Sequence, residues 1–543
     1  MEFLLLAALL NLVGFAFSDK VYFASGNYTA GVYGSGPTQQ FFSANYTPSA
    51  WNFVRPQTGI QRYPLGMCLP PPETVVGSDT IRPGPLIFDN DGHLVWDGTN
   101  FGETLVFQLE TYLGKPHILT WSGDFLATGV GNGYVSLINN RYELVARFTT
   151  DLTGITGSTG SDFHEVRITS RNTAVMTAYQ TKMMDLSPYG GLPEGFIADS
   201  VFQEVNITSG EPLFTWYASE HVDPGECFGR PGLGGAYGPW DYFHINSIDL
   251  SNDGNYLISS RYCFTLYYIN ATNGEIIWRL GGKNSSFAMG DGANYSYQHH
   301  ARWIFQNDTY ARLTVFDNAA ESNESNESSS RGLHLALNFS NMSAELIQDF
   351  IPYNKTLSQS QGSVQLQPNG NFLIGWGFMP WISEYTSSGE LLWVAQFGVV
   401  GGDFNEAYRA LRYNWSGEPT APPSIKVIRS SIDNTSNAYV SWNGDTRTQL
   451  WELLGSNISS VSGAMSLSNT SRRSFETALT VNTTAHKFNF LAVRALDEGN
   501  VSLGVSEFSS IVNGVSAILF GDWRVIFAVT VSVWIAQRTI SFI

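Results

Sequence analysis

Three short polar segments, far apart along the chain, carry histidines of a kind that can do chemistry. They contain His164, His244 and His299, which are separated by 80 and 55 residues (244 − 164 and 299 − 244). A neutral imidazole can attack as a nucleophile or exchange protons, because its unperturbed pKa is about 6.5. Arg261 stands one predicted hairpin after His244, and its planar guanidinium suits the oxygens of sulfate or phosphate. These residue types favour an oxyanion site if the fold brings them together.

The elements that must position these residues repeat one pattern between residues 80 and 400. A glycine-containing turn precedes a short run rich in β-branched and aromatic residues, and each such segment predicts a β-hairpin. The examples are residues 90–96, 252–258, 273–278, 368–374 and 388–393. Recurring hairpins favour a β-propeller, in which four-stranded blades close into a ring and equivalent strand ends converge on a central channel. Three distant histidines can then share one site.

The ordered series of motifs resembles the arylsulfotransferase family, specifically its fungal-type branch. The motifs are residues 240–248, 258–261, 274–282, 298–299 and 315–318, and the similarity covers roughly residues 80–400. Bacterial members are six-bladed propellers that move a sulfuryl group from one phenol to another without a nucleotide donor, through a sulfated histidine. The resemblance therefore implies an all-β chain with a six-bladed β-propeller over residues 19–415. It also implies an aryl sulfate donor, a phenolic acceptor and no cofactor.

The resemblance also implies roles for individual residues. The Gln-His motif makes His299 the nucleophile, while the His-x-Asn and Ser-Ser-Arg motifs make His244, Asn246 and Arg261 the groups that bind the sulfuryl oxygens. The first histidine motif adds His164. A histidine of the site can protonate the leaving phenolate and then deprotonate the acceptor.

Some positions leave alternatives open. Tyr262 stands where bacterial members commonly carry a histidine, and His300 competes with His299 for the role of nucleophile. Ser363 is a further candidate for the site. His164 and His244 can also be read as buried structural histidines, and Arg261 as the partner of Asp241 or Glu165 in a structural ion pair. The pair Asp317-Asn318 is expected to shape a turn.

Composition excludes one large class of function. Lys and Arg number 29 against 47 Asp and Glu, which gives a net charge of −18, and no cluster of five or more basic residues occurs. A protein that binds nucleic acid needs a basic face, so nucleic-acid binding is not expected. No P-loop, no dinucleotide-binding glycine motif and no H-E-x-x-H helix is present, so a nucleotide cofactor and a zinc-protease site have no support.

The two ends of the chain and its sequons predict the secretory pathway. Residues 1–18 read as a signal peptide, and eighteen N-x-S/T sequons between Asn27 and Asn500 predict N-glycans. Residues 511–543 form a hydrophobic tail that reads either as a membrane helix or as a lipid-anchor signal. The protein is therefore expected to be secreted or on the cell surface, with possible membrane attachment through this tail.

The cysteines predict little cross-linking. Cys68, Cys227 and Cys263 allow at most one intramolecular disulfide, and Cys263 is expected to be a small buried hydrophobic residue. The fold must then depend on its apolar core.

A second domain follows a proline-rich boundary at residues 419–423. Residues 424–510 hold strand-like runs whose size and spacing suit a small β-sandwich. The early Trp442 and the ending at residues 492–499 resemble a fibronectin type III module. We expect an accessory domain here.

Three functions from different classes fit these observations. The first is sulfuryl transfer between phenolic compounds in the secretory pathway or outside the cell. The second is a non-catalytic binding module at the cell surface or wall. In the third, converging imidazoles bind a zinc or copper ion. The ligands would be His164, His244, His299 and His300.

Overall fold

The computed structural model of the chain describes residues 19–55, 59–60, 67–69, 84–102, 104–126, 129–152, 160–232, 234–322, 324–401, 406–429, 435–482 and 488–511. The predicted signal peptide, residues 1–18, and all of the predicted tail after residue 511 lie outside the described residues. No helix within these ranges is long and apolar enough to cross a membrane. The chain divides into two compact units, residues 1–41, 45–420 and 443–446, and residues 42–44, 421–442 and 447–543.

The structure confirms the all-β prediction, since helical segments are few and short. They are α2 (Gly26–Thr29) and 3₁₀ turns at Thr99–Phe101, Ser187–Tyr189, Ala218–Glu220 and Pro224–Glu226.

The described residues of the first unit form six sheets of four to six strands, besides one two-stranded hairpin. The first three, in chain order, are β29-β3-β4-β5, β6-β7-β8-β9 and β10-β11-β12-β13. Their strands are β3 (Met67–Leu69), β4 (Leu86–Phe88), β5 (Leu94–Asp97) and β29 (Leu411–Arg412); β6 (Phe107–Tyr112), β7 (Lys115–Phe125), β8 (Gly131–Ile138) and β9 (Leu144–Phe148); β10 (Val166–Ile168), β11 (Thr173–Met184), β12 (Gly195–Asn206) and β13 (Pro212–Tyr217).

The other three sheets are β14-β15-β16-β17, β18-β24-β23-β20-β19 and β1-β2-β28-β27-β26-β25. Their strands are β14 (Ile245–Leu250), β15 (Tyr256–Ser260), β16 (Thr265–Ile269) and β17 (Ile276–Gly281); β18 (Ala288–Met289), β19 (His299–Gln306), β20 (Tyr310–Asp317), β23 (Arg331–Asn338) and β24 (Ser343–Phe350); β1 (Tyr22–Phe23), β2 (Asn52–Arg55), β25 (Ser363–Leu366), β26 (Phe372–Gly375), β27 (Trp381–Tyr385) and β28 (Leu391–Gln396). A short hairpin, β21 (Ala320–Glu321) with β22 (Glu324–Ser325), follows β20.

The predicted turns form hairpins in these sheets. Gly92, Gly254, Gly274, Gly370 and Gly389 all have positive φ between antiparallel strands, where a side chain would be strained. The large residues after two of these turns, Trp278 and Trp393, are buried as expected.

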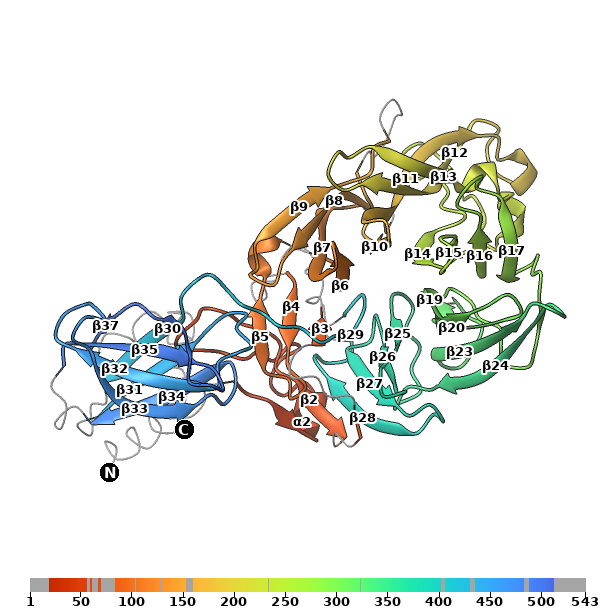
Figure 1. Ribbon diagram of the computed structural model, residues 1–543. Coiled ribbons are helices and arrows are strands. Elements are labelled where there is room, and N and C mark those ends of the chain that lie inside the picture. The colour runs from red at the N-terminus through yellow and green to blue at the C-terminus, as the bar shows by residue number, and fades with distance from the viewer. Residues whose placement is uncertain are drawn as a thin grey trace, which may run out of the picture. The chain divides into compact units, whose positions relative to one another are not determined.

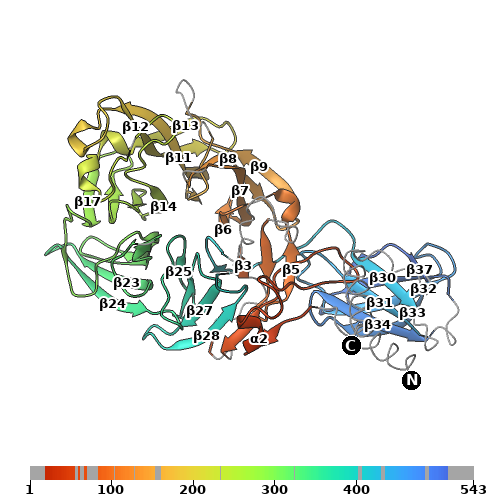
Figure 2. The same ribbon diagram turned by 180° about the vertical axis from the view of Figure 1, so that it is seen from behind.

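One edge of each sheet faces the centre of the first unit. Figures 1 and 2 show β6, β14 and β25 nearest that centre, and Figure 1 also shows β3, β10, β19 and β29 there. Neighbouring inner strands contact one another from β3 through β6, β10, β14, β19 and β25 to β29. Because β29 pairs with β3, strands from the two ends of this unit share one sheet. The segments just before the inner strands therefore come close together.

The centre of the first unit holds buried charges. Glu165 is fully buried and accepts hydrogen bonds from Arg409 at 2.8 and 2.9 Å and from Arg302 at 2.5 Å. Arg167 bonds Glu110 and Asp249, each at 2.6 Å. Buried ions of this kind are tolerated because each has an opposite charge and further hydrogen bonds.

In the second unit, the residues that the structure describes form two antiparallel sheets around one apolar core. One sheet has the order β30-β31-β34, with β30 (Ser424–Arg429), β31 (Thr435–Ser441) and β34 (Glu476–Asn482). The other has the order β33-β32-β35-β36, with β33 (Met465–Ser471), β32 (Leu450–Ser456), β35 (Phe490–Leu496), β36 (Ser502–Val505) and, also paired with β35, β37 (Ser509–Ser510). Trp442, Trp451 and Val493 lie in the shared core.

The expectation for Cys263 is wrong in one respect. Cys263 is buried as expected, but it forms a disulfide with Cys227. Cys263 follows Cys227 by 36 positions and lies just after the end of β15, and the spacing alone does not reveal that the two are close.

Candidate functional site

A cavity of about 290 Å³ brings four of the predicted residues together. His164, His244, Arg261 and His299 line it, with further walls from Phe163, Tyr262, Glu321, Gln361 and Tyr408 among others. The three histidines occupy equivalent positions, because His164 and His244 come just before the inner strands β10 and β14, and His299 begins β19. The common architecture of three sheets thus explains why residues so far apart in sequence meet.

Arg261 reaches the cavity through one hairpin. Ile245 pairs with Ser260 across β14 and β15, and the backbone N–H of Arg261 donates to the carbonyl of His244 at 3.0 Å. The hairpin therefore sets Arg261 beside His244, as the sequence predicts.

Asn318 fixes the ring of His299. The side-chain amide of Asn318 donates to the carbonyls of Ser358 and Gln361 at 2.8 and 3.0 Å, so its oxygen must face the histidine. That oxygen lies 2.7 Å from His299 Nδ1. An amide oxygen only accepts hydrogen bonds, so Nδ1 carries the proton and Nε2 keeps its lone pair. The backbone N–H of Gln361, 3.4 Å from Nε2, agrees with this tautomer.

Two aspartates hold the other two histidines. His164 Nδ1 lies 2.6 Å from Asp162, and His244 Nδ1 lies 2.5 Å from Asp241. Each aspartate also accepts the backbone N–H of its histidine, at 2.8 and 3.0 Å, so both pairs are built by short local turns. The two rings meet edge to face with centroids 4.7 Å apart. All three histidines are thus held through Nδ1.

The two buried aspartates differ in pKa, because their neighbours offset the effect of burial to different extents. Burial raises the pKa of Asp241 to about 7. Although burial alone would raise it, the pKa of Asp162 lies below its usual value, because the charge and hydrogen bonds of His164 favour the carboxylate. Paired groups whose environments separate their pKa values suit different roles in acid–base chemistry.

The cavity also favours neutral imidazoles at two positions. Burial lowers the pKa of His299 well below its usual value, and the nearby Arg261 lowers it further. Burial also lowers the pKa of His244, with contributions from His164 and Arg261. His244 and Asp241 therefore hold one proton between them near neutral pH, since the two groups titrate as a pair.

Arg261 is the cation of the cavity, and it pairs with Glu321. Its Nη1 donates to Glu321 at 2.5 Å and its Nη2 to the carbonyl of Gln359 at 2.8 Å. The predicted alternative partners, Asp241 and Glu165, are engaged elsewhere. Tyr262 donates to the same Glu321 oxygen at 2.7 Å. Arg261 Nε is buried and has no hydrogen-bond partner among the residues that the structure describes.

Three other candidates lie outside this cavity. His300 lines a different cavity beside Arg302, and its Nδ1 accepts the backbone N–H of Val364 at 3.3 Å. Adjacent residues of a strand point to opposite sides, and a register shift follows His299, so the two histidines face different surroundings. Asn246 donates to the carbonyl of Gln298 at 2.7 Å, and Ser363 bonds Ala410.

Five residues of the site are absent from the sequence-based candidates: Asp162, Asp241, Asn318, Glu321 and Tyr408. The two aspartates are detectable, since D-x-H and D-x-x-H place a carboxylate within one turn of a histidine. Asn318, expected only to shape a turn, reaches His299 because Phe316 pairs with His299 across β19 and β20. Nothing in the local sequence marks Tyr408.

The geometry gives the metal interpretation no support. Within the described ranges, no group of three or more His, Cys, Asp or Glu side chains is arranged to hold a metal ion. The positive charge of Arg261 also faces the same cavity and disfavours a cation there.

Comparison with solved structures finds proteins of low sequence identity to this chain. Among solved structures, a Bacteroides caccae protein of unknown function is 13% identical, covers 64% of this chain and 98% of its own, and has a TM-score of 0.37. Saccharomyces cerevisiae Sqt1 is 11% identical, covers 66% and 76%, and has a TM-score of 0.29. TM-scores below 0.5 do not establish a shared fold.

A search of curated proteins finds no match. The family model of the arylsulfotransferases (ASST) matches residues 108–398, more than half of the 543 residues, and these include His164, His244, Arg261 and His299. The chain belongs to the arylsulfotransferase family.

Proposed function

We propose that this protein transfers a sulfuryl group from an aryl sulfate to a phenol through a sulfated His299. Membership of the family suggests aryl sulfotransferase-like activity on such small molecules. The observation that carries the mechanism is the hydrogen bond from His299 Nδ1 to Asn318, which leaves Nε2 unprotonated. The Nε2 lone pair has one long contact, 3.4 Å, with the backbone N–H of Gln361. A covalent intermediate divides one difficult transfer into two easier steps.

In the first step, the Nε2 lone pair of His299 attacks the sulfur of the donor. The N–S bond forms, the bond from sulfur to the aryl oxygen breaks, and the phenolate leaves with that electron pair. His244 Nε2–H gives its proton to the phenolate, while Asp241 passes its proton to His244 Nδ1 across the 2.5 Å hydrogen bond. Arg261 Nε supplies an unused donor for a sulfuryl oxygen.

In the second step, the hydroxyl oxygen of the acceptor attacks the same sulfur. His244 Nε2 takes the hydroxyl proton, and the Nδ1 proton returns to Asp241. The N–S bond breaks and its electron pair returns to His299 Nε2. The protein therefore regains its starting protonation state after one transfer.

We also propose that the six sheets are the blades of a six-bladed propeller and that the histidine cavity lies at its central channel. The pairing of β29 with β3 supports ring closure. We further propose that the protein is a fungal-type member of the family and that its second unit is fibronectin type III-like. It would carry N-glycans and be secreted or anchored to a membrane. Expression in a eukaryotic host, with glycosidase treatment of medium and membrane fractions, tests these last points.

The activity is tested by mixing the secreted protein with 4-nitrophenyl sulfate and recording nitrophenolate release with and without phenol. We expect phenol-dependent release, loss of release in His299→Ala, and one SO₃ group on a His299 peptide by mass spectrometry without acceptor. His300→Asn is the matched control, because its amide oxygen can accept the same Val364 N–H. No release across a panel of aryl sulfates, from folded protein, would refute the proposal and favour a non-catalytic binding module at the cell surface or wall.

A further inference from the structure

A second and larger cavity adjoins the histidine cavity. Its volume is about 850 Å³, and Tyr262, Glu321 and Ser322 line both cavities. Pockets for small molecules commonly measure about 300–1,000 Å³, so the histidine cavity suits a single ring and the second cavity has room for more. The two cavities together can hold a longer molecule than either alone.

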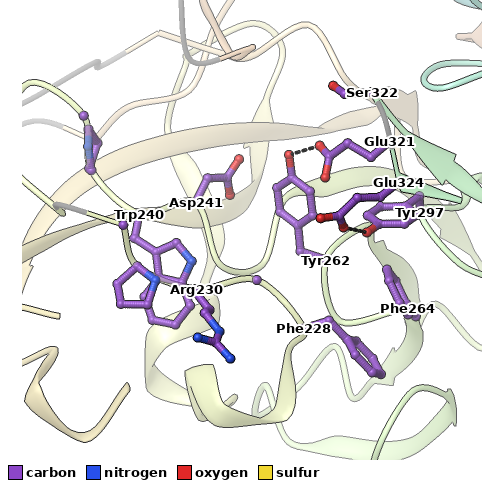
Figure 3. Close-up of a pocket in the computed structure, with 15 residues that line it drawn as sticks. Phe228, Arg230, Trp240, Asp241, Tyr262, Phe264, Tyr297, Glu321, Ser322 and Glu324 are labelled. Atoms are coloured by element: carbon purple, nitrogen blue, oxygen red, sulfur yellow. Dashed lines mark hydrogen bonds between the residues drawn. The ribbon is translucent and has the colours of Figure 1, made fainter. Parts of the chain in front are cut away.

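Five aromatic side chains line the second cavity, together with Arg230 and with glycine, proline and acidic residues. Figure 3 shows Trp240 on one side and Phe264 and Tyr297 on the other, with Tyr262 between them and Phe228 below. Phe228 is 47% exposed although it is a large apolar residue. We call this second cavity the aryl pocket.

The disulfide fixes one wall of the aryl pocket. Phe228 and Phe264 each directly follow a cysteine of the pair Cys227–Cys263. The backbone N–H of Phe228 also donates to the carbonyl of Tyr262 at 2.9 Å. The two phenylalanine rings therefore stack, with centroids 4.2 Å apart and an interplanar angle of 16°.

The backbone is strained at two of the aromatic residues that line the aryl pocket, Phe264 and Tyr297. Phe264 and Tyr297 both have a φ of 53°, which is unfavourable for bulky side chains. Such strain persists where the surrounding structure imposes it, and it is concentrated at functional sites. The Tyr297 ring meets Phe264 edge to face at 4.7 Å and lies 5.3 Å from the guanidinium carbon of Arg261. The aromatic wall thus extends to the cation of the histidine cavity.

The acidic residues of the aryl pocket are already engaged. Glu321 accepts from Arg261 and Tyr262, and Glu324 accepts from Tyr297 at 3.2 Å. Asp241 holds His244. The pocket therefore offers ring faces to a ligand, with its carboxylates hydrogen-bonded to protein groups.

We propose that the aryl pocket binds a second aromatic ring of an extended phenolic acceptor whose hydroxyl reaches the histidine cavity. This inference rests on the proposed sulfuryl transfer, and it predicts a preference for phenols with at least two rings over phenol itself. Stacking between aromatic rings supplies the affinity, because offset and edge-to-face contacts add to the burial of ring surface.

The test compares 4-phenylphenol with phenol as acceptors for the same donor. We expect 4-phenylphenol to have about tenfold higher kcat/KM than phenol, and Phe228→Ala to remove this preference by lowering kcat/KM for 4-phenylphenol. Phe264→Leu is a second variant of the same wall. Tyr237→Ala is the matched control, because Tyr237 is fully exposed in the same loop and does not line the pocket.

Binding of 4-phenylphenol, measured by calorimetry on the same variants, separates the two proposals. If 4-phenylphenol binds more weakly to Phe228→Ala and neither acceptor is turned over, the proposed transferase activity is refuted and the aryl pocket is supported. Equal kcat/KM for the two acceptors, or a Kd unchanged by Phe228→Ala, would overturn the aryl pocket.

Discussion

The side-chain oxygen of Asn318 accepts a hydrogen bond from His299 Nδ1 at 2.7 Å, and both donors of that amide are bound to backbone carbonyls. Asn318 therefore has one available orientation, and His299 has one available tautomer. This relationship makes Asn318 a positioning residue for the nucleophile, and it leads to the first prediction.

Asn318→Ala removes the acceptor that selects the Nδ1–H tautomer. We expect kcat to fall about tenfold to hundredfold, as for other residues that orient a reacting histidine. The measurement is steady-state transfer together with ¹⁵N NMR of the imidazole, which should show a mixture of tautomers in the variant. An unchanged spectrum with lower activity would contradict the positioning role.

The pKa of Asp241, about 7, predicts how the first half-reaction depends on pH. Below pH 7 the Asp241–His244 pair holds the proton that the leaving phenolate needs, and as pH rises through 7 that proton is lost. With phenyl sulfate, whose leaving group is basic, kcat/KM for the donor should therefore fall above about pH 7. Asp241→Asn should abolish this break, and 4-nitrophenyl sulfate should show it weakly. A donor profile that is flat from pH 5 to 9 would exclude the pair as the acid.

Glu321 accepts a hydrogen bond from the Arg261 guanidinium in the way that a sulfate oxygen would. Glu321→Gln removes the competing negative charge, whereas the amide oxygen can still accept the hydrogen bond from Tyr262. Hydrogen bonds to charged groups are strong, so inorganic sulfate should inhibit the variant about tenfold more tightly than the wild type. Glu390→Gln serves as a control on an exposed turn. Equal inhibition constants for wild type and Glu321→Gln would show that the carboxylate does not compete.

The buried charges at the centre of the first unit predict a stability effect. Arg409→Met leaves Glu165 with one arginine partner fewer in a fully buried position, which should lower the free energy of unfolding by about 3–5 kcal/mol. Arg141→Met, at an exposed ion pair with Glu143, should change it by less than about 1 kcal/mol. Urea unfolding followed by tryptophan fluorescence measures both. Equal midpoints for the two variants would contradict this assignment.

Short-range features of the site follow from the sequence alone. The turns around Gly92 and Gly254 depend on a residue that tolerates positive φ, so their positions are visible locally. Arg261 follows His244 through one hairpin, as predicted. The pairing of Asp162 with His164 is not among the predictions, but it spans only two residues and is detectable locally. Contacts of this kind depend on backbone geometry near one point of the chain, and the motif series additionally indicates the family.

Tertiary structure decides the remainder, because it depends on how separate sheets pack. The sequence allows either His299 or His300 as nucleophile, and the strand geometry turns one toward the Arg261 cavity and the other toward Arg302. Arg261 pairs with Glu321 instead of Asp241, and Cys227 forms a disulfide with Cys263. These two contacts join segments that are 60 and 36 residues apart. Such pairings depend on burial, charge and space at the meeting of several sheets, and a one-dimensional pattern does not contain that information.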